Sequence, residues 1–260
     1  MENAVENPDT VGTKPRAAIR ELYDRLCITP CLGLQDFRCP HLPECSPKPG
    51  RSDVPFHTGT WPYIGACYGQ ARVLGNLIRI LFVAMERGGQ YNPAEEPTFS
   101  DTQWAFRDSA ENRRNPHMGG ASQLMEYLVE DKVPDVYSTQ FALTNAVKCV
   151  EYTKRMNSTS TPTMIRNCAE HLRVEITLLQ PHLIVTQGRH PTNTVQQLFP
   201  GLTPVAEFVG DAGRSAVLVG KRFVVLTTPH PARKIGWRWK RGPLPTFLQD
   251  AVRRAQEVRK

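Results

Sequence analysis

The chain has 260 residues and a formal net charge of +7, and 40% of its residues are hydrophobic, as in ordinary soluble globular proteins. No apolar run approaches the ~20 residues that cross a bilayer, and the polar, acidic first residues do not resemble a signal peptide. These features argue against a membrane protein and predict a cytoplasmic one, whose excess of basic residues favours a polyanionic partner.

The amino-terminal part of the chain is predicted to be an arm. Residues 1–15 are expected to be a disordered tail, and residues 16–76 a helix followed by a cysteine-rich segment. The helix is predicted over residues 17–26, because the apolar residues there fall on one face. Residues 50–76 hold turn residues and aromatics, and we interpret them as a loop packed on the core.

Four of the seven cysteines crowd into a short proline-rich part of this arm. An odd cysteine count without a secretion signal argues against a disulfide framework. In a cytoplasmic chain such crowding predicts a metal site. The spacing C-x3-C-x7-C-x5-C matches a zinc ribbon only loosely, because zinc ribbons use C-x2-C pairs. The four residues are Cys27, Cys31, Cys39 and Cys45.

Residues 77–260 are predicted to form one α/β domain. Short apolar runs predict buried strands at residues 80–83, 141–149, 181–188, 216–219 and 223–227. Amphipathic patterns predict helices at residues 120–130, 163–179, 192–199 and 245–258. Because strands and helices alternate, we expect a three-layer sandwich: a central, mostly parallel sheet with helices on both faces.

The first of these strands ends in a polar turn that is a candidate ligand site. Glu86 follows the apolar run 80–83, and Gly88 and Gly89 come directly after it. Open α/β sheets bind ligands at the carboxyl ends of their strands, and glycines let the backbone turn sharply and approach a ligand closely. An ordinary strand-to-loop junction with a solvated Glu would give the same pattern, so this stretch alone leaves both interpretations open.

Five later segments form an ordered set of motifs. They are Arg114-Asn-Pro-His-Met-Gly-Gly-Ala-Ser-Gln-Leu-Met125, Leu143-Thr-Asn-Ala-Val-Lys-Cys149, Asn167-Cys-Ala-Glu-His-Leu172, Pro181-His-Leu-Ile-Val-Thr-Gln-Gly188 and Thr227-Thr-Pro-His-Pro-Ala232. Together they resemble the uracil-DNA glycosylase superfamily, particularly its iron–sulfur bacterial and archaeal branches. The resemblance implies the glycosylase fold, DNA as the partner, and an enzyme that acts as a monomer.

The resemblance also implies roles for individual residues. Such an enzyme flips a base into a pocket and hydrolyses its N-glycosidic bond. Glu86 falls where relatives place the catalytic Asp or Asn, and His230 falls on the His that stabilises the departing base. Asn145 would pair with the Watson–Crick edge of the base, because an amide offers both a donor and an acceptor. His117 would occupy the stacking position of a Phe. The other candidates for the base pocket are Met85 and Gly88.

Each of these roles has a plainer alternative. Asn145 could end a strand by bonding local backbone. His230, between two prolines, could belong to a simple turn, and His117 could be an exposed loop histidine. The motif around Glu86 departs from the family pattern, since Arg87 stands where relatives have Pro.

The resemblance further implies a [4Fe–4S] cluster. In the iron–sulfur relatives, cysteines at the positions of Cys149 and Cys168 join two amino-terminal cysteines around the cluster, because iron prefers soft thiolate ligands. Which two of Cys27, Cys31, Cys39 and Cys45 would join them stays open. Zinc in the amino-terminal segment is the alternative cofactor, and Cys149 and Cys168 could instead be buried small hydrophobes.

A basic, aromatic segment at residues 234–242 follows His230 directly. In relatives the loop at this place enters the minor groove, so Trp237 or Trp239 would unstack a base step while neighbouring cations meet phosphates. A solvated basic turn with inward-packed tryptophans is the plainer alternative. The cationic candidates are Arg233, Lys234, Arg238, Lys240 and Arg241.

The substrate stays open between two bases. Uracil-specific relatives place a Tyr against the C5 edge of the base, and Gly88 stands at that position here. The base would be uracil, or a C5-modified pyrimidine such as the hydroxymethylated or glucosylated cytosine of some phage genomes, in which case the enzyme would serve antiviral defence. A hypothesis of another class is a non-catalytic iron–sulfur DNA-binding protein on the same fold. A hydrolase of the Ser-nucleophile type is disfavoured, because the Gly-x-Ser-x-Gly elbow is absent.

Overall fold

The computed structural model of the chain describes most of the segment that the motifs span. The residues it describes are 13–25, 39–46, 56–57, 62–86, 108, 116–130, 138–152, 158–210, 213–231 and 244–258.

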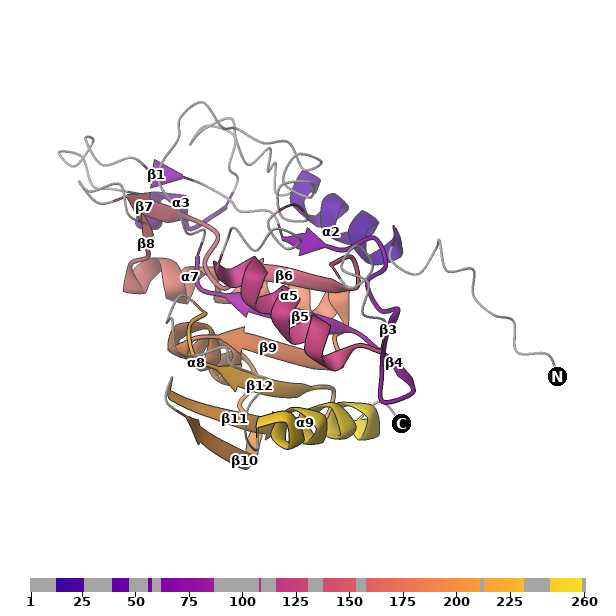
Figure 1. The fold of residues 1–260 in the computed structure, drawn as a ribbon. Coiled ribbons are helices and arrows are strands. Elements are labelled where there is room, and N and C mark those ends of the chain that lie inside the picture. The colour runs from indigo at the N-terminus through magenta and orange to yellow at the C-terminus, as the bar shows by residue number, and fades with distance from the viewer. Residues whose placement is uncertain are drawn as a thin grey trace.

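A seven-stranded sheet forms the centre of the molecule, with the strand order β10-β11-β12-β9-β5-β6-β2 (Figure 1). Its four inner strands pair in parallel: β12 (Val224–Thr228), β9 (Leu183–Gln187), β5 (Ile80–Ala84) and β6 (Phe141–Asn145). The other three strands pair antiparallel with their neighbours: β10 (Thr203–Gly210) and β2 (Tyr63–Ile64) at the two edges, and β11 (Gly213–Val219) between β10 and β12. The predicted α/β fold with a mostly parallel central sheet is therefore confirmed.

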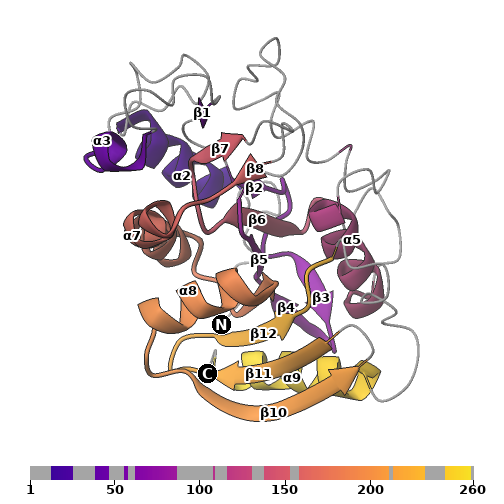
Figure 2. The same ribbon diagram turned by 90° about the vertical axis from the view of Figure 1, so that its left-hand side faces the viewer.

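Helices cover both faces of this sheet (Figure 2). One face packs on α5 (Pro116–Leu128) and α9 (Leu244–Val258), and the other on α7 (Pro162–Leu179) and α8 (Arg189–Leu198). β5 illustrates why: Ile80 and Phe82 belong to the first hydrophobic core, and Leu81 and Val83 to the second. Successive side chains of a strand point to opposite faces, so a strand that is apolar throughout has to be covered on both sides.

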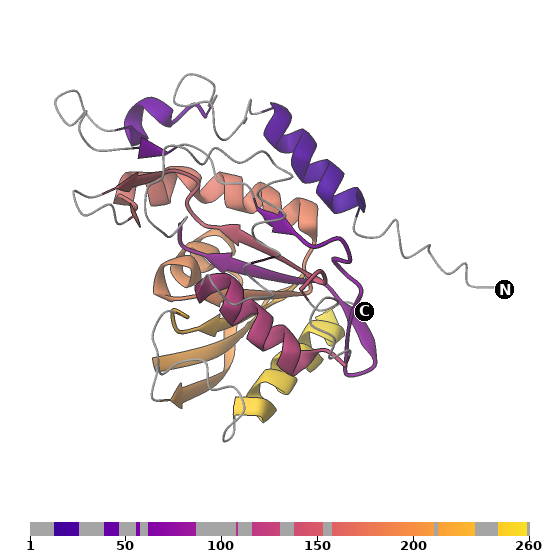
Figure 3. The same cartoon turned by 45° about the horizontal axis from the view of Figure 1, so that its top comes forward.

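The two described helices of the amino-terminal arm pack on the α7 side of the sheet. α2 (Thr13–Arg25) lies against α7 on the side away from the sheet (Figure 3). The short helix α3 (Leu42–Cys45) also contacts α7. β2, which comes from the segment assigned to the arm, pairs with β6. The division of the chain at residue 77 stays a prediction.

Small strands complete the described structure. β1 (Phe56–His57), β7 (Val150–Tyr152) and β8 (Ser158–Thr159) form a three-stranded sheet, and β3 (Ala71–Val73) and β4 (Asn76–Ile78) form a hairpin. The segment that we interpreted as a loop, residues 50–76, thus contains short strands. None of the described helices has the length and apolar character needed to cross a membrane.

Two predicted element boundaries are wrong in ways that matter for function. The strand predicted at residues 141–149 ends at Asn145. The next two N–H groups, of Ala146 and Val147, both donate towards β5, to the carbonyls of Ala84 and Met85 at 2.8 Å, whereas successive N–H groups of a regular strand point to opposite sides. The helix predicted from residue 120 begins at Pro116, because a proline fits the first position of a helix. His117 therefore lies in the first turn of a helix rather than in a loop.

Two strands of the central sheet were not predicted: β2, in the segment interpreted as a loop, and β10, at the other edge. β10 contains Pro204, and its Val205 and Val209 are exposed, so it lacks the apolar pattern of an inner strand. It forms the edge of the sheet, where proline is tolerated.

Candidate active site

Four polar residues lie at the carboxyl ends of the four parallel strands, along what we call the carboxyl edge of the sheet. β5, β6, β9 and β12 are parallel, so their carboxyl ends lie at the same edge. Glu86 follows β5, Asn145 ends β6, Gln187 ends β9 and His230 follows β12. The chain leaves β5 over one face through α5 and leaves β6 over the other face through α7, which makes this edge a topological switch point.

The Glu86 side chain is half-buried and held by a hydroxyl. Ser160, between β8 and α7, donates a hydrogen bond from Oγ to Glu86 Oε2 at 2.5 Å. The neighbouring Thr161 caps α7: its hydroxyl accepts the Met164 N–H at 3.2 Å, and Pro162 opens the helix. The start of α7 thus fixes the residue that holds the carboxylate. Met85 is half-buried and packs on the core beneath α7.

His117, Gln187 and His230 form a second contact group. The Gln187 side chain forms two hydrogen bonds with His117: its Oε1 lies 2.7 Å from Nδ1, and its Nε2 donates to the His117 carbonyl at 3.0 Å. Because the amide nitrogen is used on the carbonyl, the oxygen faces Nδ1, which therefore carries the proton. The His117 and His230 rings meet edge to face with 4.7 Å between their centroids.

The environment keeps His117 neutral near pH 7. Burial lowers its pKa from 6.5 to about 4; the bond to Gln187 opposes this shift, and the proximity of His230 adds to it. A neutral His117 with its proton on Nδ1 leaves Nε2 as a hydrogen-bond acceptor. The ring can therefore act as an uncharged flat surface with one acceptor on its edge.

The ends of β6, β9 and β12 are closely packed. Asn145 is only 4% exposed. Gly188, which follows β9, has a φ of 111° and lies against His230: a Cβ placed there would be 3.6 Å from the His230 Cβ. Its N–H donates to the Thr228 carbonyl at 2.9 Å, and the Thr228 hydroxyl donates to the Thr186 carbonyl at 2.8 Å. These bonds tie the end of β12 to the end of β9.

Four cysteines come together on the α7 side of the sheet. Cys39, Cys45, Cys149 and Cys168 are each at most 9% exposed and belong to one hydrophobic core. We call them the cysteine group. Among the residues that the structure describes, no three His, Cys, Asp or Glu side chains are already spaced to hold a metal ion.

Hydrogen bonds reach the sulfurs of the cysteine group from neighbouring residues. The Lys148 N–H donates to Cys168 Sγ at 3.3 Å, and the Asn167 amide donates to Cys45 Sγ at 3.6 Å. His171 Nε2 lies 3.4 Å from Cys39 Sγ. A hydrogen bond from Cys149, and secondarily Lys148, lowers the pKa of Cys168 to about 7, whereas burial raises the pKa of Cys39 and Cys45. Cys168 is thus the most readily ionised of these three thiols.

Some predicted site residues lie outside the described part of the chain. They are Gly88, Cys27, Cys31, Arg233, Lys234, Trp237, Arg238, Trp239, Lys240 and Arg241.

Sequence reasoning missed several residues of the site. Gln187 precedes the glycine exit of a predicted strand, so its polar character at a strand end was an available signal. Ser160 and His171 carry no such signal, because tertiary packing alone brings them to Glu86 and Cys39.

The fold and the site define a class: an open α/β protein with a polar site at a switch point of its parallel sheet. The model of the family described as the uracil DNA glycosylase superfamily matches residues 79–253, and the chain belongs to this superfamily. Membership indicates DNA glycosylase activity and DNA as the partner. No curated protein matched the chain.

Proposed function

We propose that the chain is a monofunctional DNA glycosylase that flips a pyrimidine base out of DNA and hydrolyses its N-glycosidic bond, leaving an abasic site. The observation that carries the proposal is the convergence of Glu86, Asn145, Gln187 and His230 at the ends of four adjacent strands. A carboxylate, an amide and an imidazole are the groups that such a reaction requires at one place.

Glu86 and His230 would stabilise opposite charges in the transition state. As the glycosidic bond breaks, positive charge develops on the sugar and negative charge on the departing base. Ser160 holds one carboxylate oxygen of Glu86, which leaves the other available to orient the attacking water below the sugar. His230 would donate a hydrogen bond to the base oxygen, where preorganised donors are most effective.

Asn145 and His117 would hold the flipped base. The amide of Asn145 offers a donor and an acceptor to the Watson–Crick edge. His117 would stack on the base, and its neutrality matters because a charged ring at this depth would be costly to desolvate. The base is uracil or a pyrimidine with a C5 substituent. The second choice rests on Gly88, a glycine at the position where uracil-specific relatives have a Tyr, and it would make the enzyme an antiviral one.

The cysteine group supports a [4Fe–4S] cluster as the cofactor. Its donor set consists of four buried thiols, which suits iron–sulfur clusters or zinc. Bonds from N–H groups to cysteine sulfur, like that from Lys148 to Cys168, are also the contacts that tune such clusters. Cys39, Cys45, Cys149 and Cys168 would hold the cluster, which would tie the amino-terminal arm to α7.

The test is mass spectrometry of bases released from a panel of DNAs by the purified protein. The panel contains uracil, cytosine, hydroxymethylcytosine and glucosylated hydroxymethylcytosine, each in single- and double-stranded DNA. We expect release of uracil or of a modified cytosine, and its loss in Glu86→Gln. Glu170→Gln, at an exposed site on α7, is the control that keeps activity. Bound DNA without release of any base would contradict the proposal and favour a non-catalytic binding protein.

Metal analysis tests the cofactor separately. We expect iron and acid-labile sulfide in protein purified without oxygen, and their loss in Cys168→Ser but not in Cys67→Ser, because Cys67 is half-buried and outside the cysteine group. Stoichiometric zinc in place of iron would contradict the iron–sulfur assignment.

A further inference from the structure

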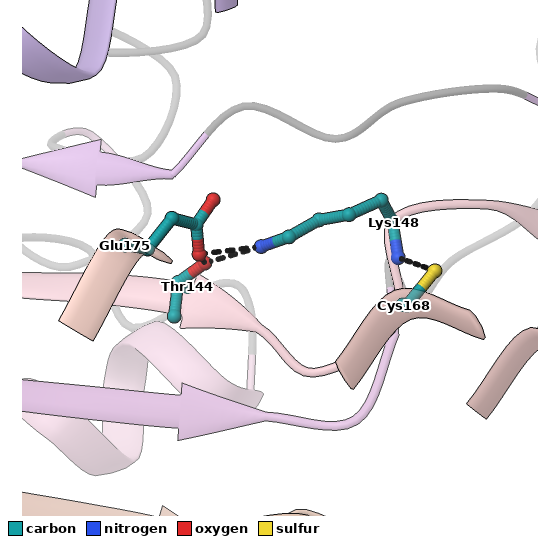
Figure 4. Close-up of polar contacts among 4 residues, drawn as sticks. All are labelled: Thr144, Lys148, Cys168 and Glu175. Carbon is teal, nitrogen blue, oxygen red and sulfur yellow. Dashed lines mark hydrogen bonds and ion pairs between the residues drawn. The ribbon is translucent and has the colours of Figure 1, made fainter. Parts of the chain in front are cut away.

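A buried ion pair joins the segment after β6 to α7. Lys148 Nζ and Glu175 Oε2 are 2.7 Å apart, and the two side chains are 2% and 0% exposed. Thr144 closes a triangle with them: its Oγ1 accepts from Lys148 Nζ at 2.7 Å and donates to Glu175 Oε2 at 2.6 Å (Figure 4). Every member of this triangle thus has its charge or hydroxyl satisfied by the other two.

Such a pair is not explained by stability alone. Two charges lose their hydration when they are buried, and well-packed apolar side chains in the same place are often at least as stabilising. What a buried pair does supply is a fixed geometry, because neither partner can leave without exposing the other as an unpaired buried charge. The position of the triangle in the chain suggests what it fixes.

The triangle closes the turn 144–149. Lys148 reaches back four residues to Thr144, which directly precedes Asn145. Inside the turn, the N–H groups of Ala146 and Val147 hold the carbonyls of Ala84 and Met85, the two residues before Glu86. At its far end, the Lys148 N–H donates to Cys168 Sγ. One short turn therefore contacts the two residues before Glu86, carries Asn145 and donates a hydrogen bond to Cys168 of the cysteine group.

We propose that Thr144, Lys148 and Glu175 form a latch that positions Asn145 and the backbone leading to Glu86. They are positioning residues, because they would act through the turn that carries Asn145. This inference rests on the proposed function for its catalytic consequence. Opening the latch would let the turn shift against β5, and displacement of a reacting group by about 1 Å can lower a rate by about 10²-fold.

The test replaces the latch with apolar groups of similar volume. The triple variant Thr144→Val, Lys148→Met, Glu175→Met leaves no buried charge, so it should unfold at about the wild-type temperature or higher. We expect its kcat for base release to fall by about 10²-fold, with a smaller change in KM. We also expect faster amide hydrogen exchange at Ala146 and Val147. Asp250→Asn, which removes a surface ion pair on α9, is the control that changes neither.

A single-site pair keeps the test decisive if the triple variant does not fold. Thr144→Val removes the hydroxyl from the triangle and leaves the ion pair, whereas Thr144→Ser keeps the hydroxyl. If the latch acts as proposed, amide hydrogen exchange at Ala146 and Val147 is faster in Thr144→Val than in Thr144→Ser. The kcat for base release is also lower in Thr144→Val. Equal exchange and equal kcat in these two variants would overturn it.

Hydrogen exchange separates this inference from the proposed function. If wild-type protein releases no base but the triple variant loses protection at Ala146 and Val147, the latch stands and the glycosylase proposal fails. If wild-type protein releases a base and the triple variant keeps both its protection and its kcat, the latch fails and the enzyme stands. The triangle would then be ordinary core packing.

Discussion

At the scale of single residues, the site combines an oriented acidic side chain with a histidine that is kept neutral. Glu86 is half-buried, and the Ser160 hydroxyl on one of its oxygens gives its side chain a defined orientation. His117 is buried against His230 and Gln187, which favours its neutral form. In the proposed function, a flipped nucleotide would thus meet an oriented Glu86 side chain on the sugar side and an uncharged ring beside the base.

The neutrality of His117 makes a prediction about stability and pH. Its pKa is about 4 in the folded protein and near 6.5 in the unfolded chain, so the unfolded chain takes up a proton as the pH falls through this range. Above pH 6.5 His117 is neutral in both states and does not lower the stability. As the pH falls towards 4, protonation of the unfolded chain lowers the free energy of unfolding by about 3 kcal/mol. His117→Phe removes this term, so we expect its unfolding free energy to fall less than that of the wild type between pH 7 and pH 4.5.

Urea denaturation of both proteins at the two pH values measures the difference. His171, whose pKa burial also lowers, is present in both and cancels in the comparison. An identical pH dependence in the two proteins would mean that His117 is not held neutral.

At the scale of elements, the junction between β9 and α8 is a constrained part of the site. Gly188 caps α8 with φ 111° and ψ 174°, a backbone region that is open almost only to glycine. We expect Gly188→Ala to lower the free energy of unfolding by about 1–3 kcal/mol through backbone strain. The new methyl would also contact His230, so base release should fall as well.

The matched control is Gly201→Ala. Gly201 lies in a turn where a Cβ would meet no atom within 4 Å, and its φ is not in the left-handed region. Its unfolding midpoint and its rate of base release should equal those of the wild type. Equal stability of the Gly188→Ala variant and the wild type would show that the junction relaxes without cost.

The elements also differ in how far the sequence reveals them. β5 could be predicted because a strand buried on both faces is an unbroken apolar run, whatever its neighbours are. The end of β6 could not, because Ala146 and Val147 are apolar and buried like the strand before them. The regular strand ends because both of their N–H groups turn towards Ala84 and Met85, some sixty residues earlier, and no local pattern records that.

The same distinction separates the site residues. Glu86 could be proposed because polar residues after buried strands gather at the carboxyl ends of a parallel sheet, whereas Asn145 was proposed from the family resemblance, since the predicted strand ran past it. Ser160 lies in an irregular segment before α7, and only the folded chain brings its hydroxyl to Glu86. Lys148 stands within an apolar stretch, and its partner Glu175 lies 27 residues further along the chain on another element.

At the scale of the whole molecule, the candidate active site and the cysteine group lie at different parts of the sheet. The strand ends supply the candidate chemistry, whereas the α7 side carries the cysteine group and the arm with α2 and α3. The opposite face, covered by α5 and α9, is an apolar core that supports the strands from behind. DNA that delivers a base to the strand ends must therefore approach the carboxyl edge, and cations there should meet its phosphates.

Two exposed cations test this orientation of the DNA. Arg189 follows Gly188 at the carboxyl edge, and Lys221 lies just before β12, at the opposite edge. We expect Arg189→Ala to weaken DNA binding and to reduce the slope of log affinity against log salt by about one, because one phosphate contact is lost. Lys221→Ala removes the same charge from the net +7 but from the far edge, so its affinity and slope should stay close to wild type. Fluorescence anisotropy with a labelled duplex across a salt series measures both quantities. An equal loss in the two variants would show that binding follows net charge alone, and a larger loss in Lys221→Ala would place the DNA at the wrong edge for Glu86 and His230 to act on a base.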